Sequence, residues 1–195
     1  MLPDTTVRFL ASEAGEVRTD NGMLTVLAEG RYEDVPHPDV VVVPGGPGTW
    51  ALLEDERVID WMRTAHESSR YTTSVCTGSL LLAAAGLLDG TEATTHWLAY
   101  DQLGQLGALP VSERVVERGR IITAAGVSAG IDMGLRLAEL ITDPEMAQAA
   151  QLLIEYDPQP PFDSGSPDKA PSEVVELVRA GLRRQEASGR ASSSQ

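Results

Sequence analysis

The stretch VVVVPGGPG, from Val40 to Gly48, decides the fold that we expect for this chain of 195 residues. Four successive valines make a strand that is apolar on both faces, which is typical of a central strand in a parallel sheet. Proline and glycine residues then end the strand in a tight turn. Residues 49–69 carry apolar side chains at helical spacing, so the pattern predicts a strand that leads through a turn into a helix.

The same alternation of strand and helix extends along the chain in both directions. It favours an α/β doubly wound, mostly parallel sheet with helices on both faces. Strands are expected at residues 6–11, 23–30, 71–75 and, as a pair about a turn at 117–119, within 114–126. Further helices are expected at residues 77–86, 95–107, 129–140, 143–157 and 172–185.

The length and composition indicate one domain, at residues 1–170, with a helix at 171–187 and a disordered tail at 188–195. Between the last two helices, the segment Asp157–Pro167 contains four prolines, which keep it extended at low entropic cost. We expect this segment to pack against the domain.

The chain is strongly acidic, with 15 Lys and Arg residues against 29 Asp and Glu residues and a net charge of −14. This charge disfavours nucleic acid and anionic membrane surfaces as partners. The sequence has no leader peptide pattern and no apolar run long enough to span a membrane. A single cysteine makes no intrachain disulfide, so we expect a cytoplasmic protein with a reduced thiol.

Cys76, the only cysteine, lies where the predicted strand 71–75 meets the predicted helix 77–86. In open α/β sheets, ligand sites form at the carboxyl ends of the strands. The unpaired N–H groups at a helix start favour an anion, which suits a thiolate nucleophile. We therefore expect Cys76 at a tight turn in strained backbone. A second interpretation stays open, because free cysteines are often buried as small apolar residues.

Gly45 and Gly46 follow the four-valine strand and lack side chains, so their N–H groups can approach a ligand closely. We interpret them as oxyanion-type donors beside Cys76. The stretch matches neither a phosphate-binding loop nor a dinucleotide fingerprint. The alternative is an ordinary turn between a strand and a helix.

Three histidines occur, at positions 37, 66 and 96. His37 lies between prolines and is expected on the surface, and His66 is expected to favour the dipole at a helix C-terminus. His96 is the candidate to support the thiol, since a cysteine paired with a distant histidine is usual in thiol enzymes. A structural histidine is the equal alternative. We expect no metal site and no cofactor.

Five stretches together resemble the ThiJ/PfpI superfamily, which has a flavodoxin-like, class I glutamine amidotransferase-like fold. The stretches are VVVVPGGPG, SVCTGSLLLAAAGLLDG, ATTHW, TAAGVSAGIDMGLRL and EYDPQPPFDSG. The resemblance runs from about Thr6 to Pro167, and the last stretch is the mark of the isonitrile hydratase-like branch. The cysteine turn and TTHW are shared with the ligand-sensing domains of some AraC-type regulators.

The resemblance implies a thiol enzyme that hydrates an isonitrile, a small-molecule substrate, to an N-substituted formamide. Cys76 corresponds to the family's reactive cysteine and Thr77 to the hydroxyl residue beside it in the hydratase branch. Gly45 and Gly46 correspond to the glycine pair that orients the substrate. Peptidase-type members have a histidine at the position of Thr77, so a peptidase is disfavoured. A homodimer is also expected.

Family members begin with a strand and a helix ahead of the counterpart of residues 6–11, and that segment carries acidic residues that reach the cysteine. In the sequence given, neither Asp4 nor Glu13 matches that motif. We therefore expect a strand-sized gap between residues 6–11 and 40–43. Direct pairing of the two strands, filling of the gap by another chain, and poor folding are the three expected outcomes.

Three other functions remain open from the sequence. One is a ligand-sensing module without catalysis, although no DNA-binding region follows the domain. Another is a thiol-based protein that acts on glyoxals or senses oxidation through Cys76. The third is an inactive member of the family, because the acidic residues that reach the cysteine have no counterpart here.

Overall fold

A computed structural model describes residues 4–181 of the chain. The described residues fall into two compact units, one that ends at Glu155 and one that begins at Tyr156. The predicted tail at 188–195 and the end of the last predicted helix, 182–187, lie outside the described residues. The first unit contains the sheet and all of the predicted site.

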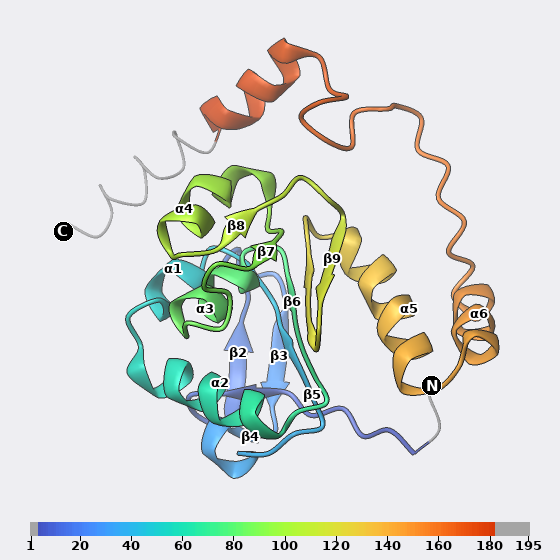
Figure 1. Cartoon of the computed structure of the whole chain (residues 1–195). Coiled ribbons are helices and arrows are strands. Elements are labelled where there is room, and N and C mark those ends of the chain that lie inside the picture. The colour runs from blue at the N-terminus through green and yellow to red at the C-terminus, as the bar shows by residue number, and fades with distance from the viewer. Residues whose placement is uncertain (1–3, 182–195) are drawn as a thin grey trace. The chain divides into compact units, whose positions relative to one another are not determined.

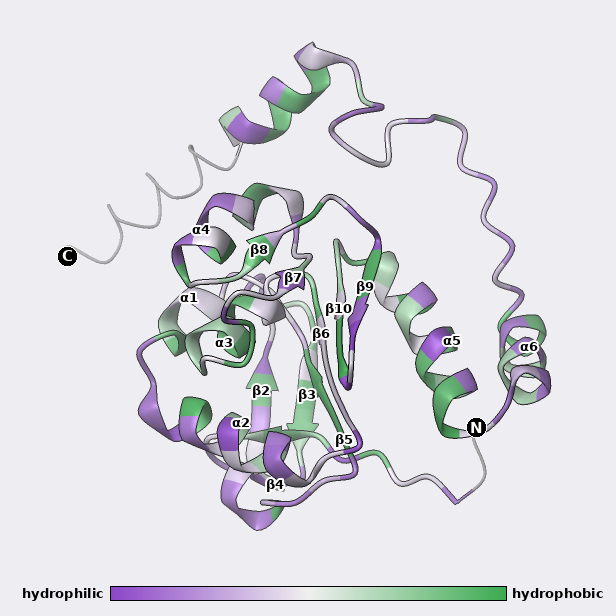
Figure 2. Cartoon of the chain, viewed as in Figure 1, coloured by the Kyte–Doolittle hydropathy of each residue, from purple (hydrophilic) through white to green (hydrophobic). Residues whose placement is uncertain are grey.

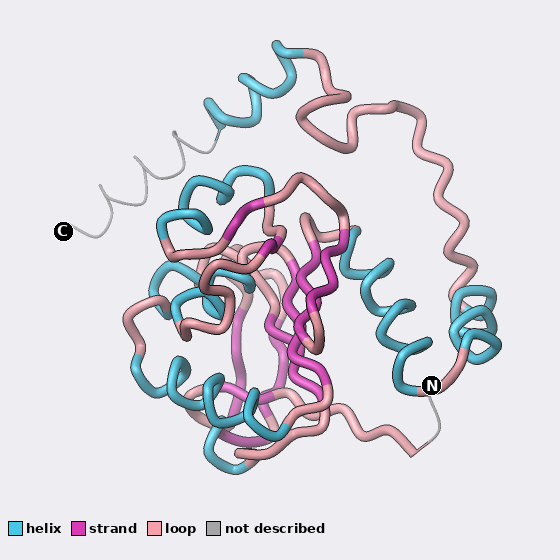
Figure 3. The backbone as a smooth tube through the Cα atoms, in the orientation of Figure 1, coloured by secondary structure: helices cyan, strands magenta, loops and turns pink. Residues whose placement is uncertain are grey.

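The order of helices and strands can be followed in Figure 1 and, by type, in Figure 3. The strands are β1 Leu10–Ala11, β2 Gly15–Arg18, β3 Thr25–Ala28, β4 Gly30–Arg31, β5 Val40–Val43, β6 Tyr71–Val75, β7 Glu92–Ala93, β8 Leu109–Pro110, β9 Val115–Arg118 and β10 Ile121–Ala124. The α-helices are α1 Thr49–Leu52, α2 Glu56–Ser68, α3 Gly78–Ala84, α4 Tyr100–Gln105, α5 Ala129–Ile141 and α6 Pro144–Leu153. Two short 3-10 helices are η1 Tyr32–Asp34 and η2 Trp97–Ala99.

The main sheet has four strands in the order β5-β6-β10-β9. β5, β6 and β10 run parallel, and β9 joins β10 as an antiparallel hairpin. Helices α2 and α3 lie on one side of this sheet and α5 on the other, as Figure 1 shows. The predicted flavodoxin-like α/β architecture, mostly parallel with helices on both faces, is thereby confirmed.

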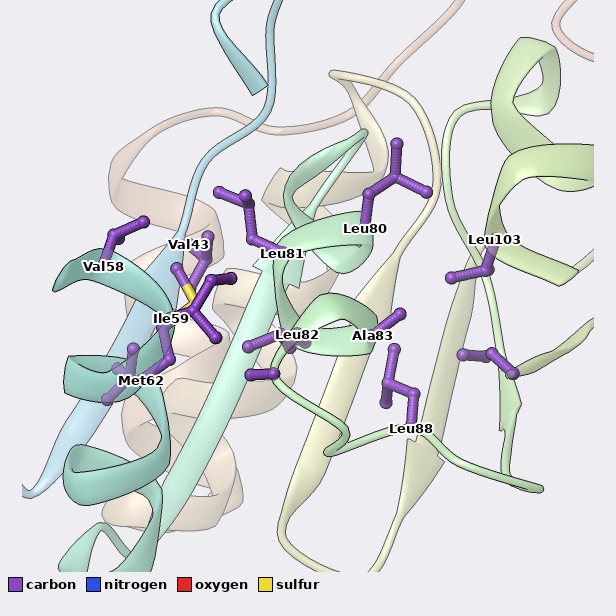
Figure 4. Packing of buried hydrophobic residues seen from close by; sticks show 14 of the residues in the cluster. Val43, Val58, Ile59, Met62, Leu80, Leu81, Leu82, Ala83, Leu88 and Leu103 are labelled. Atoms are coloured by element: carbon purple, nitrogen blue, oxygen red, sulfur yellow. The ribbon is translucent and has the colours of Figure 1, made fainter. Parts of the chain in front are cut away.

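The hydrophobic core lies between the sheet and helices α2 and α3 (Figure 4). β5 supplies Val41 and Val43 to it, α2 supplies Val58 and Met62, and the apolar run of α3 is buried along almost its whole length. β10 contains hydrophobic residues (Figure 2), whereas the middle of β6 is Thr72, Thr73 and Ser74. These polar side chains are buried as well, because the strand is covered on both faces. A second, smaller core packs α5 against the opposite face.

Two helices begin directly after an aspartate whose side chain caps them. Asp55 caps α2 by accepting a hydrogen bond from the Arg57 amide, and Asp143 caps α6 in the same way through the Met146 amide. Pro144 occupies the first turn of α6, where proline is favoured. Ser128 directly precedes α5, but its side chain makes no capping hydrogen bond.

Some predicted elements differ from those observed. The helix expected over 49–69 is divided into α1 and α2, because the Asp55 cap starts a new helix. The strand expected at 6–11 is regular only at Leu10–Ala11, where it pairs with β4. The strand at Gly15–Arg18 was not predicted, and it forms an antiparallel hairpin with β3.

The four-valine strand β5 lies at an edge of the main sheet and not at its centre, so this part of the prediction is wrong. A cavity of about 770 Å³ runs along the free edge of β5. β5 and Pro44 line one side of it, and Thr6, Arg8 and Leu10 are among the residues that line another. Of the three expected outcomes, direct pairing of residues 6–11 with β5 does not occur within the described residues, since β1 pairs with β4. The cavity lies where the gap is expected.

The second unit contains an irregular segment and a helix. Residues 157–170 form neither helix nor strand, and residues 172–181 are helical. Within the segment, Lys169 forms an ion pair with Asp163. That Asp157–Pro167 packs against the domain stays a prediction. Over the described part of the chain, no helix combines the length and the apolar character needed to cross a membrane.

Candidate active site

Cys76 lies at the turn between β6 and α3, where its φ angle is +60°. A non-glycine residue in this left-handed region is strained, so the prediction of a strained turn is confirmed. The Cys76 amide holds the turn in place by donating to the carbonyl oxygens of Ala124 (3.0 Å) and Ala125 (2.8 Å) at the end of β10. The backbone of the neighbouring strand therefore fixes the direction of the thiol.

Gly78 brings the start of α3 against the end of β5. A Cβ atom at this position would overlap the carbonyl oxygen of Val43 and would lie 2.9 Å from that of Pro44. Only a residue without a side chain fits between the helix and these two backbone groups. This contact places the loop that carries Gly45 and Gly46 directly beside the cysteine turn.

The glycine pair contacts Thr77, the residue that follows Cys76. A Cβ atom on Gly45 would lie 2.5 Å from the Thr77 amide nitrogen, so the two backbones touch. The Gly46 amide donates a hydrogen bond of 2.9 Å to the Thr77 hydroxyl oxygen. That hydroxyl also forms a 2.9 Å hydrogen bond with the hydroxyl of Thr49, at the start of α1. The predicted closeness of the two loops is confirmed, and the Gly46 amide is already engaged by Thr77.

On its other side, the cysteine turn contacts the TTHW stretch. The Thr95 hydroxyl is buried and donates a 3.0 Å hydrogen bond to the Cys76 carbonyl oxygen. His96 is half-buried, and its Nδ1 accepts a hydrogen bond from the Leu98 amide, so the proton of the neutral ring sits on Nε2. The ring packs against Gly126, since a Cβ atom there would lie 3.4 Å from His96 Cδ2.

Three contributors to the site were missed from the sequence. Thr49 and Thr95 bind the turn through their hydroxyl groups, and Gly126 leaves room for the His96 ring. Thr49 carries no recognisable signal in the sequence, whereas Gly126 lies in the stretch TAAGVSAGIDMGLRL, which carries part of the family resemblance. Thr95 lies in the TTHW stretch, which could have drawn attention to it.

The other two histidines lie away from this turn. His66 Nδ1 is 2.9 Å from the Thr72 hydroxyl, at the beginning of β6, and His37 Nδ1 is 3.2 Å from the Ser68 hydroxyl. Burial and the nearby Arg120 guanidinium lower the pKa of His66. His66 lies in the last turn of α2, as expected, but burial and Arg120 outweigh any stabilisation of its charged form by the helix dipole.

The Cys76 thiol is partly exposed, and it makes no hydrogen bond within residues 4–181. The same residues contain no cluster of three or more His, Cys, Asp or Glu side chains arranged to hold a metal ion. The chemistry that this arrangement can supply is that of a strained, accessible thiol. Hydroxyl groups and a backbone amide bind the cysteine turn, and the His96 imidazole packs against Gly126.

Burial lowers the pKa of His96 below its ordinary value. Below about pH 6.5, the His96 side chain binds a proton more readily in the unfolded chain than in the folded chain. The free energy of unfolding therefore decreases as the pH drops through this range. We expect the free energy of unfolding to decrease from pH 7.5 to pH 5, and His96→Gln to make the decrease smaller. Urea unfolding at both pH values measures this, and equal decreases in the two proteins would contradict it.

Thr77 is expected to stabilise the contact between the two loops. Thr77→Val keeps the shape of the side chain but leaves the Gly46 amide without its acceptor, which should cost about 1–3 kcal/mol of unfolding free energy. Thr77→Ser keeps the hydroxyl and should cost less. Urea unfolding compares the three proteins, and equal stability of the valine and serine variants would show that the hydrogen bond contributes nothing.

Comparisons with known proteins agree on one family. The sequence profile of the DJ-1/PfpI family matches residues 3–140. Isonitrile hydratase from Pseudomonas putida is 49% identical over 178 residues, which cover 91% of this chain and 78% of that protein. The transcriptional regulator CdhR from Pseudomonas aeruginosa is 33% identical over 140 residues, and the match spans 41% of its length.

Among solved structures, a ThiJ/PfpI family protein from Pseudomonas syringae superposes with a TM-score of 0.85 at 38% identity. The superposition covers 93% of this chain and 77% of that one. The agreement therefore extends over nearly the whole sequence and is not confined to the cysteine turn.

Proposed function

The chain belongs to the DJ-1/PfpI family, and from this premise we propose that it hydrates an isonitrile to an N-substituted formamide through Cys76. The observation that carries the proposal is the 49% identity to isonitrile hydratase over 91% of the chain. The strained turn at Cys76 supports it, since such turns present a nucleophile at the open end of a parallel sheet.

The reaction proceeds in two steps. In the first, the Cys76 sulfur forms a bond to the isonitrile carbon, and a proton is added to that carbon, giving a thioimidate with a C=N bond. In the second, water adds to the same carbon, the nitrogen takes a proton, and the C–S bond breaks. The products are the formamide and the free thiol, so one isonitrile and one water are consumed with no change of redox state.

Thr77 and the glycine loop orient the substrate in this proposal. The Thr77 hydroxyl bridges the Gly46 amide and the Thr49 hydroxyl, so its position is fixed next to the thiol. Because the Gly46 amide is engaged in this bridge, Gly46 acts by positioning Thr77. The Gly45 amide is left as the backbone donor toward the substrate.

His96 orients the substrate nitrogen by donating a hydrogen bond to it, and the proton that the nitrogen takes comes from the attacking water. Its Nδ1 accepts from the Leu98 amide, which leaves Nε2–H as the donating group. Burial lowers the pKa of His96 and favours the neutral ring, which donates a hydrogen bond through Nε2–H and does not give up this proton. His96 packs against Gly126, next to the carbonyl oxygen of Ala125 that holds the Cys76 amide.

We propose further that the protein acts as a homodimer in the cytoplasm, where its single thiol stays reduced. The test of the function is formamide production from tert-butyl and benzyl isonitrile by the purified chain, followed by chromatography. Methylglyoxal is offered in parallel. Consumption of methylglyoxal without formamide production would show that the protein acts on glyoxals and does not hydrate isonitriles. Loss of neither substrate would favour a sensing or inactive protein.

A further inference from the structure

Hydrogen bonds hold both of the peptide groups that flank the Cα atom of Cys76. The Cys76 amide donates to the carbonyl oxygens of Ala124 and Ala125, and the Cys76 carbonyl oxygen accepts a 3.0 Å hydrogen bond from the Thr95 hydroxyl. The two peptide groups are planar, so their orientations set the φ and ψ angles of the residue between them. These hydrogen bonds together therefore fix the direction of the Cys76 Cα–Cβ bond, which carries the thiol.

Cys76 requires support on both sides, because its φ angle of +60° is strained. A strained conformation persists only where the surrounding structure determines it. On the carbonyl side, the Ser79 hydroxyl lies 3.3 Å from the Cys76 oxygen, but it belongs to the first turn of α3 and moves with the cysteine turn. Thr95 lies 19 positions after Cys76, in a separate loop, so it can hold the carbonyl in place from outside the turn.

The loop that carries Thr95 is itself tied to the main sheet. One residue earlier, the Thr94 amide donates a 3.0 Å hydrogen bond to the Thr123 hydroxyl on β10. Thr123 pairs with Ser74 of β6, two residues before Cys76. All four of these threonine and serine side chains are buried, so water does not compete for the hydrogen bonds between the loop, the sheet and the turn. The sheet therefore sets the position of the Thr95 hydroxyl.

We propose that Thr95 is a positioning residue for the reaction at Cys76. Its hydroxyl holds Cys76 in the left-handed conformation, and its peptide bond to His96 keeps the imidazole in a fixed place relative to the thiol. Thr95 acts through the Cys76 backbone and through His96, and it has no contact with the substrate. The kinetic part of this inference rests on the proposed function, whereas the part that concerns the conformation of Cys76 does not.

A matched pair of valine variants separates positioning from stability. Thr95→Val keeps the shape of the side chain and removes the donor to the Cys76 carbonyl. Thr73→Val makes the same change three residues before Cys76, where the Thr73 hydroxyl donates a 2.9 Å hydrogen bond to the Val41 carbonyl oxygen. Both threonines are fully buried, so the two variants should lower the urea midpoint by similar amounts. Thr95→Ser keeps the hydroxyl and should restore the wild-type behaviour.

The conformation of Cys76 is measured without a substrate. The chain has one cysteine, so protein labelled with ¹³C-cysteine gives a single Cα signal in an NMR spectrum, and its chemical shift depends on φ and ψ. Thr95→Val should move this signal away from its wild-type position. Thr73→Val and Thr95→Ser should leave it in place.

The kinetic measurement is formamide production over a range of isonitrile concentrations. Thr95→Val should lower kcat about tenfold or more and change KM less than about threefold, because a misdirected thiol slows the chemical step and leaves substrate binding intact. Thr73→Val should retain the wild-type kcat despite its lower stability, and Thr95→Ser should recover most of the lost rate.

Three results would overturn the inference. One is an unmoved Cα signal in Thr95→Val, and another is a moved signal with an unchanged kcat. The third is an equal effect of Thr95→Val and Thr73→Val on the signal and on kcat, because this would leave Thr95 with a role in stability alone. If the wild-type chain produces no formamide, the proposed function fails, and the Cα signal alone decides whether Thr95 holds Cys76 in place.

Discussion

Cys76→Ala is expected to lower formamide production from an isonitrile about a thousandfold or more, because the C–S bond is the first bond formed in the proposed reaction. Substrate-positioning groups such as Thr77 remain in this variant, so any residual rate reports what positioning alone contributes. The measurement is the initial rate of formamide formation at saturating isonitrile, with the wild-type chain assayed in parallel.

Cys76→Gly is a matched control for Cys76→Ala, because glycine relieves the backbone strain at this turn. Alanine and cysteine both carry a Cβ atom and share the cost of the +60° φ angle, whereas glycine adopts this conformation freely. Cys76→Gly should therefore be more stable than Cys76→Ala by about 1 kcal/mol and equally inactive. A variant lacking the thiol that retains a tenth of the wild-type rate would exclude Cys76 as the nucleophile.

Gly78→Ala is expected to cause the largest loss of stability of any single change proposed for this chain, about 3 kcal/mol or more. The new methyl group would overlap the Val43 carbonyl oxygen, and backbone on both sides leaves it no space to move. The start of α3 would have to shift away from the end of β5, which would also displace the cysteine turn. Urea unfolding at a constant m-value measures the loss.

Gly134 gives the corresponding control within a helix. It lies inside α5, where an added Cβ atom meets no atom within 4 Å. Gly134→Ala should stabilise the protein by about 0.5–1 kcal/mol, because alanine has the higher helix propensity. If Gly78→Ala and Gly134→Ala unfold at the same urea concentration, the close approach of backbone at Gly78 does not affect the free energy of unfolding.

Much of the candidate site can be predicted from the sequence because its signals are local. The run 71–86 contains a β-prone strand, one cysteine and an apolar helix, and the structure places Cys76 between β6 and α3 as expected. The loop with Gly45 and Gly46 lies beside it because β5 and β6 are parallel neighbours, so their carboxyl ends meet.

Other features depend on contacts between residues that are far apart in the sequence, and no local sequence pattern predicts them. The hydrogen bond between Thr49 and Thr77 joins residues that are 28 positions apart, and neither residue type indicates the other. The hairpin strand β2 is largely exposed, so it lacks the apolar alternation that identifies a half-buried strand. The four valines of β5 correctly predict a strand with two apolar faces, but a residue pattern does not say which neighbour covers each edge.

The central claim is that Cys76 forms a covalent bond to the isonitrile carbon. It is tested most directly by quenching the reaction in acid during the first turnover and mapping the peptides by mass spectrometry. The peptide that contains Cys76 is expected to gain the mass of one isonitrile molecule, and this species should appear before the formamide and decay as the formamide forms. Formamide produced at the same rate without any such adduct, by the wild-type chain and by Cys76→Ala alike, would contradict it.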